Sequence, residues 1–214
     1  MRKMYCLVIA TWMLFILAGV SETHAQDSVG QSDHVKQQPF NNIEEMTLDL
    51  LGIISNHQAK YPANQAAYFE ALNRLMEGFV DFDFVAKKVM GKYYKAASKE
   101  QRVRFESEFR RGLIETYGRG LMSYGDQKIV LINKSPLKKG QKAVVVKQEI
   151  RSASAVYPLN YLMYRKKSTG EWNVVNVTLN GIDLSKTFAS QFLNAARKNQ
   201  GNIDQVVDNW LSGS

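Results

Sequence analysis

The spacing of the hydrophobic residues changes from a helical to a strand pattern near Gly125, and that change limits the folds open to this chain. Before Gly125 the large apolar residues recur about every four positions, which places them on one helix face; the longest run is Phe105, Phe109, Leu113, Tyr117, Leu121 and Tyr124. After Gly125 come four segments rich in Val, Ile and Tyr, at 128–133, 142–150, 156–165 and 171–179. Short polar connections between them are typical of sequential antiparallel strands.

Helical patterns flank these strands on both sides. Ser98 and Gln101 form a capping-box pattern at the start of the longest helix. Other helices are expected between Ile43 and Ile54, between Tyr68 and Phe79, and at 187–198 and 202–211. Helices first, a sheet next and helices last indicate the α+β class. We predict helices packed on a curved four-stranded antiparallel sheet, enclosing a cone-shaped hydrophobic cavity.

The first 25 residues have the order of a secretory signal peptide. Arg2 and Lys3 precede a charge-free, mostly apolar run of 17 residues, 4–20, and a polar stretch then ends at Ala25. The alternative is an uncleaved membrane anchor, but the run is shorter than the roughly 20 residues that a bilayer span needs. We therefore expect cleavage after Ala25, a polar, disordered tail at 26–40 and a single α+β domain at 41–214.

The cysteine count and the charge narrow the compartment and the partners. Cys6 is the only cysteine, so the exported chain has none, which favours the bacterial periplasm over a disulfide-rich secreted context. The chain has a formal net charge of +8. Export excludes nucleic acid as the usual partner. Anionic lipid surfaces and acidic protein faces remain, as does a charge that only maintains solubility.

Few residues in the chain have the spacing that catalysis or metal binding needs. His34 and His57 have no metal-ligand partners at suitable spacing, and no serine lies in a Gly-x-Ser-x-Gly elbow. Asp81 and Asp83 are either helix caps or an acid–base pair with carboxyl pKa values raised by aromatic neighbours. We favour the capping role. The sequence thus predicts no metal, no cofactor and no enzyme activity.

The stretch from Val80 to Tyr94 carries more aromatic surface than two short helices can bury alone. Aromatic stripes recur on the other helices and on both faces of the strands. Such an excess fits either a solid core or an interior lined for a greasy ligand. From the residues alone, both interpretations remain open.

Two stretches of the chain resemble the MlaC family. The first is Phe82-Asp83-Phe84, then Lys88-Val89-Met90-Gly91-Lys92-Tyr93-Tyr94, then Ser98, Gln101, Phe105, Phe109 and Tyr117. The second is Gly170-Glu171-Trp172-Asn173-Val174-Val175-Asn176-Val177, then Asn180-Gly181-Ile182-Asp183-Leu184 and Phe192. The resemblance covers about 43–211. Members of this family, also called toluene-tolerance or auxiliary transport proteins, are periplasmic lipid-binding components of an ABC-type phospholipid transport system.

The resemblance implies a monomeric phospholipid shuttle on an NTF2-like cone. Its partners would be an inner-membrane ring-forming component of an ABC transporter and an outer-membrane lipoprotein complex, in a system that maintains outer-membrane lipid asymmetry. Asn176 and Asp183 depart from the family, whose members often have aspartate and serine there. Alternatively, the protein is a hopanoid-binding relative of these carriers, with a hopanoid as its cargo. The alternative function is an enzyme for a hydrophobic substrate on an NTF2-like fold, with Asp81 or Asp83 as the base.

Stripe position and strand alternation, rather than the resemblance, select the candidate site residues. The predicted lipid-pocket lining is Phe79, Phe82, Val85, Phe109, Leu113, Tyr117, Val146, Tyr161, Met163, Val174 and Val177. Arg151 and Arg165, at strand ends, are the candidate headgroup ligands.

Overall fold

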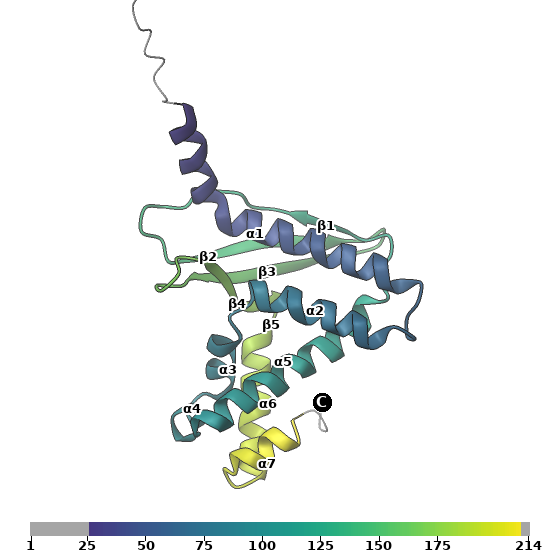
Figure 1. The fold of residues 1–214 in the computed structure, drawn as a ribbon, viewed down its shortest axis with the longest axis vertical. Helices are drawn as coiled ribbons and strands as arrows, with labels where there is room; N and C mark the ends of the chain where they lie inside the picture. Colours follow the sequence, from purple (N-terminus) through teal and green to yellow (C-terminus); the bar gives the residue numbers. More distant parts are fainter. Residues whose placement is uncertain (1–25, 211–214) are drawn as a thin grey trace, which may run out of the picture.

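The change of spacing at Gly125 is the change from helix to strand in the structure (Figure 1). The computed structural model describes the backbone of residues 26–210 and the side chains of 38–210; the predicted signal peptide lies outside this range. The helices before the sheet are α1 (Gln26–Gln58), α2 (Gln65–Phe79), α3 (Phe82–Met90), α4 (Tyr93–Ala96) and α5 (Lys99–Leu121). The rest are β1 (Lys128–Leu131), β2 (Ala143–Arg151), β3 (Val156–Arg165), β4 (Trp172–Leu179), β5 (Ile182–Asp183), α6 (Leu184–Lys198) and α7 (Ile203–Asp208).

The sheet is an antiparallel meander in the order β1-β2-β3-β4-β5. The mixed helix-and-sheet class is therefore confirmed, but the predicted strand number is wrong by one. The fifth strand has two residues and pairs with the end of β4. It follows a two-residue turn in which Asn180 and Gly181 both have positive φ, of 48° and 82°. An Asn-Gly pair favours this tight hairpin turn, which the sequence analysis did not predict.

The polar segment 26–40, expected to be a disordered tail, is helical. Helix α1 begins at Gln26 and contains Pro39, and Phe40 is only 1 % exposed. The prediction failed because it relied on the absence of an apolar stripe. Such a stripe reports packing against a core, and a helix that extends past its sheet needs none. The start of α1 does extend past the sheet (Figure 1).

The predicted caps are confirmed. The Gln101 amide donates to Ser98 Oγ at 3.1 Å, and the Ser98 amide donates to Gln101 Oε1 at 2.9 Å, which completes the capping box. Asp81 caps α3 by accepting a 3.1 Å hydrogen bond from the Phe84 amide. Gly91, with a φ of 54°, ends α3 and bends the chain into α4. These local contacts set the direction in which each helix leaves its turn.

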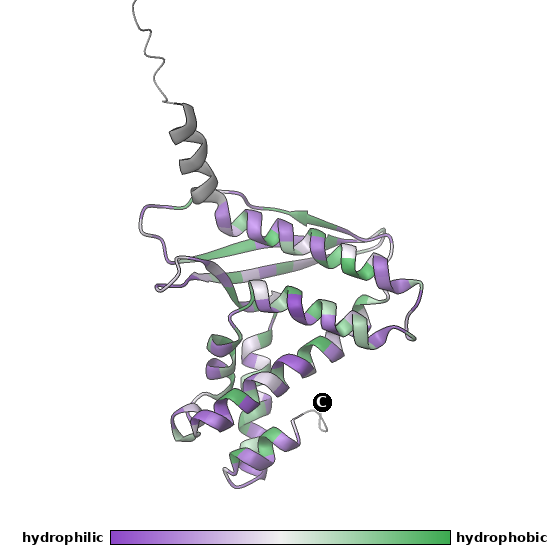
Figure 2. Cartoon of the chain, viewed as in Figure 1, coloured by the Kyte–Doolittle hydropathy of each residue, from purple (hydrophilic) through white to green (hydrophobic). Residues whose placement is uncertain are grey.

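The buried apolar residues form two large groups instead of one cone-shaped interior. Helices α1 and α2 lie against the sheet, and α3, α5, α6 and α7 pack together at the other end of the molecule (Figures 1 and 2). The sheet cluster comprises Phe40, Ile43, Met46, Leu75, Val146, Leu159, Tyr161, Met163, Trp172 and Val174. The bundle cluster comprises Val85, Ala86, Val89, Met90, Ala97, Phe105, Phe109, Phe192, Ala196, Ile203, Val206 and Val207.

Candidate functional site

An open groove lies between α1 and α2, with a volume of about 590 Å³. Its α1 wall is Leu48, Asp49, Gly52, Ile53 and Asn56, and its α2 wall is Ala71, Arg74, Leu75, Gly78 and Phe79. This volume falls in the range of roughly 300 to 1,000 Å³ that small-molecule sites occupy. Leu48, at the groove, is 70 % exposed, which is unusual for a leucine on a helix that packs against a sheet.

Two glycines, one on each wall, leave open space in this groove. A Cβ atom added to Gly52 or Gly78 would meet no heavy atom within 4 Å. A glycine inside a helix costs about 1 kcal/mol relative to alanine, so neither residue is explained by helix stability. Both are explained by the open space that they leave in the groove walls.

Three residues of the groove walls also contact the apolar cluster on the sheet. Ile53 and Phe79 pack against the sheet cluster, and Leu75 belongs to it. The inner sheet face beneath carries Val146 and Met163, both 0 % exposed. A ligand entering between the helices would therefore meet side chains that gain from contact with hydrocarbon.

Thr47 and Gln148 are the buried polar side chains that join α1 to the sheet. Thr47 Oγ1 donates to the Ile43 carbonyl at 2.7 Å and accepts from Gln148 Nε2 at 3.0 Å. These bonds tie α1 to β2 within the sheet cluster. Burial raises the pKa of the Tyr161 hydroxyl above its ordinary value. Neither the Thr47–Gln148 pair nor Tyr161 lines the groove.

The structure brings six of the predicted lining residues together. Val146, Tyr161, Met163 and Val174 are buried in the sheet cluster, and Phe79 and Val177 pack against it. Of these, Phe79 also lines the groove. Their role in lipid binding remains a prediction.

The other five lie elsewhere. Val85 and Phe109 belong to the bundle cluster and Leu113 packs against it. Phe82 lies beneath the Arg110 guanidinium, 5.6 Å from ring centroid to Cζ, and Tyr117 is 44 % exposed. The aromatic stripe of α5 packs against Phe188 and Phe192 of α6 and against Trp210, not against the sheet. A single joint pocket for all eleven residues is therefore wrong.

The groove residues that sequence reasoning missed are chiefly Leu48, Gly52, Ile53 and Gly78. The available signal was a glycine inside each of two helical patterns, at positions 52 and 78.

The two headgroup candidates cannot act together. Arg151 ends β2 opposite Val156, the first residue of β3, whereas Arg165 is the last residue of β3. Nine steps of roughly 3.3 Å separate these ends by about 30 Å. Arg151 pairs with Glu149 at 2.8 Å, and Arg165 Nε donates to the Gly170 carbonyl at 3.0 Å. The cation that does line the groove is Arg74.

The two aspartates considered as catalytic bases lie at the start of α3, away from the groove. Besides capping α3, Asp81 pairs with Lys166 at 3.4 Å. Asp83 is exposed in the first turn of α3. Neither lines the groove. Among the described residues, no three His, Cys, Asp or Glu side chains are grouped as a metal site would require.

Asn176 and Asp183 join β4 to α6. Asn176 Oδ1 accepts from the amides of Val177 at 2.8 Å and Ser185 at 3.1 Å, and Asp183 caps α6 through the Lys186 amide. Partial burial opposes ionisation of Asp183, but the Lys186 amide, Asn176 and nearby lysines outweigh it and lower its pKa. The two departures from the family pattern thus lie at a structural junction.

Within 26–210, no helix combines the length and hydropathy needed to cross a membrane. A solved phospholipid-binding protein from Ralstonia solanacearum, in complex with a phospholipid, matches this fold with a TM-score of 0.71 at 20 % identity. The match covers 83 % of this chain and 96 % of that one. It shows that the two proteins share a fold.

Sequence comparison adds relatives and a family. The toluene tolerance protein ttg2D of Pseudomonas putida is 34 % identical over 175 residues, covering 81 % of this chain and 80 % of the relative. The intermembrane phospholipid transport system binding protein MlaC of Haemophilus influenzae is 31 % identical over 131 residues, 60 % of each chain. Because residues 44–212 also match the MlaC protein family model, the chain belongs to the MlaC family.

Proposed function

We propose that this protein is a phospholipid carrier of the bacterial cell envelope. The observation that carries the proposal is the groove between α1 and α2, whose wall residues Ile53, Leu75 and Phe79 also pack in the apolar cluster on the sheet. The solved neighbour with this fold was obtained with a phospholipid, and the H. influenzae relative is named for intermembrane phospholipid transport. The cargo is a phospholipid whose acyl chains lie in the groove and against the sheet cluster.

The energy of exposing acyl chains explains why a carrier would hold them inside. Two chains of about 15 methylenes each, at roughly 0.8 kcal/mol per methylene, cost on the order of 24 kcal/mol to expose to water. Release into the aqueous space would be very slow, so transfer takes place while the carrier is docked. The docking partners that we propose are an inner-membrane ABC transporter component and an outer-membrane lipoprotein complex, each meeting a monomeric carrier.

Export and the lack of catalysis belong to the same proposal. The N-terminal pattern ending at Ala25 directs the chain to the periplasm, where a carrier between two membranes would work. The relatives are named for tolerance, transport and binding, not for a reaction. Asp81, the candidate base, already caps a helix and pairs with Lys166.

A leucine placed in the groove tests this site. Gly78→Leu projects a side chain into the open space of the α2 wall, whereas Gly120→Leu places the same side chain on α5, where a Cβ also meets nothing within 4 Å. Both changes remove a helix glycine, so both favour the helix. Phospholipid extracted from each protein after purification from the cell envelope is then counted per chain.

We expect Gly78→Leu to lower the phospholipid content severalfold while Gly120→Leu matches the unaltered protein. Far-ultraviolet circular dichroism and thermal unfolding verify that both variants fold. Equal phospholipid content in the two variants would show that the acyl chains do not use this groove.

A further inference from the structure

Positive charge is concentrated in two short parts of this chain. Residues 128–147 contain six lysines and no carboxylate, and one of these lysines, Lys134, pairs with Glu44. The other part has no such pair among the described side chains. Residues 87–102 contain six cations and one carboxylate, a net charge of +5, compared with +8 for all 214 residues. The cations are Lys87, Lys88, Lys92, Lys95, Lys99 and Arg102, which we call the basic surface. It is formed by the end of α3, by α4 and by the start of α5.

We propose that the basic surface docks this protein onto the anionic face of a phospholipid bilayer. The inference concerns a surface separate from the groove, and it holds whether or not the groove carries lipid. Its partner is the layer of headgroups on a membrane.

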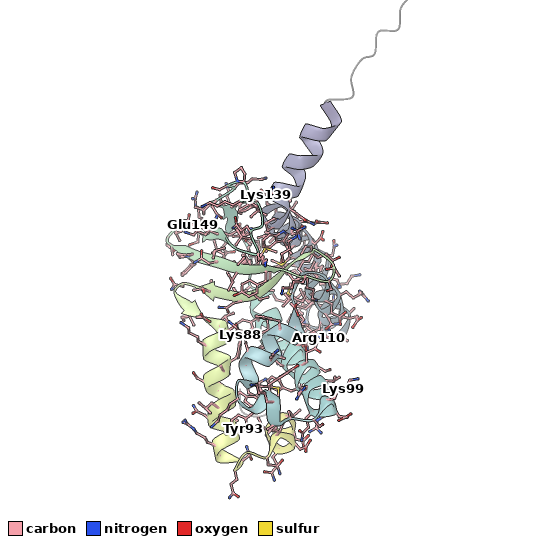
Figure 3. All side chains as sticks on the ribbon, turned by 90° about the vertical axis from the view of Figure 1, so that its left-hand side faces the viewer. Lys88, Tyr93, Lys99, Arg110, Lys139 and Glu149 are labelled. Atoms are coloured by element: carbon pink, nitrogen blue, oxygen red, sulfur yellow. The ribbon has the colours of Figure 1, made fainter. Side chains whose placement is uncertain are left out.

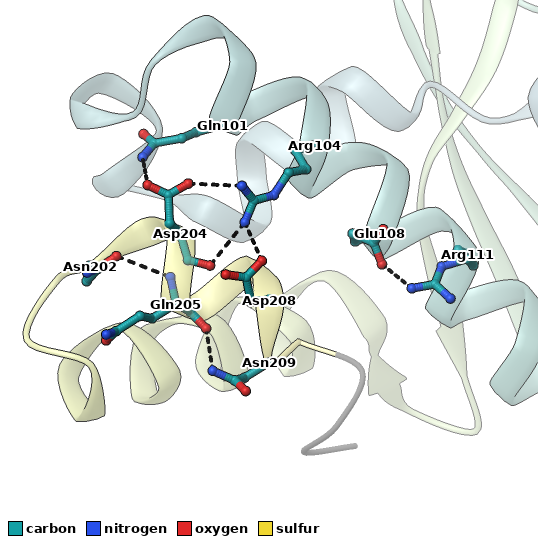
Figure 4. A network of polar contacts seen from close by, with 9 residues as sticks. All are labelled: Gln101, Arg104, Glu108, Arg111, Asn202, Asp204, Gln205, Asp208 and Asn209. Atoms are coloured by element: carbon teal, nitrogen blue, oxygen red, sulfur yellow. Dashed lines mark hydrogen bonds and ion pairs between the residues drawn. The ribbon is translucent and has the colours of Figure 1, made fainter.

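The cations of this surface are available to a partner. The five lysines are exposed, and within the described side chains none of the six cations lies within 4 Å of a carboxylate oxygen. Arg102 donates instead to the carbonyls of Tyr94 at 2.8 Å and Lys95 at 3.4 Å. Arg104, two residues on, shows the contrast, since Asp204 and Asp208 of α7 both bind it (Figure 4).

Packing beneath the lysines gives the surface a defined shape. The Tyr94 ring has Lys87 Nζ 5.4 Å and Arg102 Cζ 4.4 Å from its centroid. Lys92 lies over Tyr93 at 5.3 Å, and Tyr93 in turn packs against Phe192 of α6 with ring centroids 6.0 Å apart. These cation–π contacts hold the stems of long side chains while their charges face solvent.

The surface lies at the end of the molecule away from the sheet. Tyr93 and Lys99 lie towards the helical end in Figure 3, Lys88 lies on the helical part nearer the sheet, and Lys139 lies beside the sheet. Gly201 approaches Tyr93, so the end of α6, with the exposed Arg197 and Lys198, extends the same positive region. A protein docked through this end would keep the groove between α1 and α2 clear of the membrane plane.

The carboxylates near the surface do not cancel its charge. Glu100 is exposed, and a hydrogen bond from its own backbone amide, followed by one from the Ser98 side chain, lowers its pKa. It is the one carboxylate already counted in the net charge of +5. Asp183 is near enough to Lys88 for their charges to interact, but it already caps α6. Asp204 is bound to Arg104 and Gln101 (Figure 4).

The type of cation favours a bilayer over an acidic protein. Protein interfaces are enriched in arginine and depleted in lysine, because the planar guanidinium fits a fixed carboxylate while an ammonium acts as a mobile point charge. Five of the six cations are lysines, and the single arginine is bonded to backbone carbonyls. Clusters of four to eight basic residues are typical of surfaces that bind anionic lipid headgroups.

Vesicle binding tests the proposal. The protein purified from the cell envelope is sedimented with phosphatidylcholine vesicles that contain either no anionic lipid or about 30 % phosphatidylglycerol. We expect binding only to the anionic vesicles, and a decrease as salt is added, because exposed charges are screened. Absence of binding to anionic vesicles at low salt would overturn the proposal and leave an acidic protein face as the partner class.

Matched variants separate the basic surface from net charge. One variant combines Lys92→Gln, Lys95→Gln and Lys99→Gln; its control combines Lys138→Gln, Lys139→Gln and Lys142→Gln in the exposed β1–β2 connection. Each removes three positive charges. The first should weaken vesicle binding on the order of 100-fold, and the control severalfold at most.

Equal weakening by the two variants would refute a specific surface, since net charge alone would then govern binding. Phospholipid content per chain is measured for both variants as well. It should equal that of the unaltered protein, so a loss of vesicle binding is not confused with a failure to carry lipid.

Discussion

The hydroxyl of Tyr68 attaches α2, one wall of the groove, to the end of α5. Tyr68 is 0 % exposed, and its hydroxyl donates to the Gly118 carbonyl at 2.8 Å. A helix leaves its last four carbonyls without helical partners. In α5 three of these accept from the turn that follows, through the amides of Met122, Ser123 and Tyr124. The fourth is that of Gly118, and Tyr68 satisfies it.

Tyr68→Phe removes this donor and leaves the carbonyl buried. The net loss of a hydrogen bond is about 1 kcal/mol, and an unsatisfied buried acceptor raises the cost to about 3 kcal/mol. We therefore expect the free energy of unfolding to fall by about 1 to 3 kcal/mol. For a protein of this size each kcal/mol lowers Tm by roughly 2 to 4 °C.

Urea and thermal unfolding measure this change, with Tyr157→Phe as the matched control. Tyr157 is 43 % exposed, and its substitution should alter stability by less than about 0.5 kcal/mol. If Tyr68→Phe were as stable as the control, the Tyr68 hydroxyl would not hold α2 to α5 and the reasoning would be refuted.

Three further results follow from the same structure. Burial, and to a smaller extent Tyr61, raises the pKa of Tyr68 to about 12. The protonated hydroxyl should therefore stabilise the fold fully below about pH 10, and this stabilisation should be lost as the pH rises through about 12. Tyr68→Phe should flatten this part of the stability–pH curve, and an unchanged slope would contradict the prediction. Gly118→Ala should destabilise by about 1 to 3 kcal/mol because its Cβ would lie 2.8 Å from Leu72 Cδ1. Gly120→Ala adds a Cβ with no heavy atom within 4 Å, so it should stabilise the protein by about 0.5 to 1 kcal/mol. If urea unfolding gave stability changes of the same sign for both variants, the close packing at Gly118 would be contradicted. Arg104→Ala should lower the free energy of unfolding by about 0.5 to 1 kcal/mol, because two carboxylates of α7 lose their partner. Arg119→Ala, which loses a 3.7 Å ion pair with Glu115, should lower it less. If thermal unfolding gave the reverse order, α7 would be held without Arg104.

The elements were predictable where the signal is local. The capping box of Ser98 and Gln101, the cap at Asp81 and the bounds of β3 depend on residues within a few positions of one another. The Asn180-Gly181 hairpin was equally local and was missed, although both residues adopt the positive φ that their types permit. The helical start of α1 was missed because a helix without an apolar stripe gives no periodic signal.

The site was predictable only in part, because a stripe shows which face of a helix is buried and not which neighbour buries it. Phe109 and Val146 are equally apolar, yet one lies among helices and the other against α1. Strand alternation did select Val146, Tyr161 and Met163 correctly as one inner face. The groove depends on Gly52 and Gly78 facing the same space, and only the packing of α1 on α2 brings them together.

Native mass spectrometry of the protein purified from the cell envelope tests the carrier function most directly. We expect a complex of one chain with about one phospholipid, which collisional activation releases as an intact lipid ion. A chain that is free of lipid throughout, with its fold verified by circular dichroism, would contradict the carrier function.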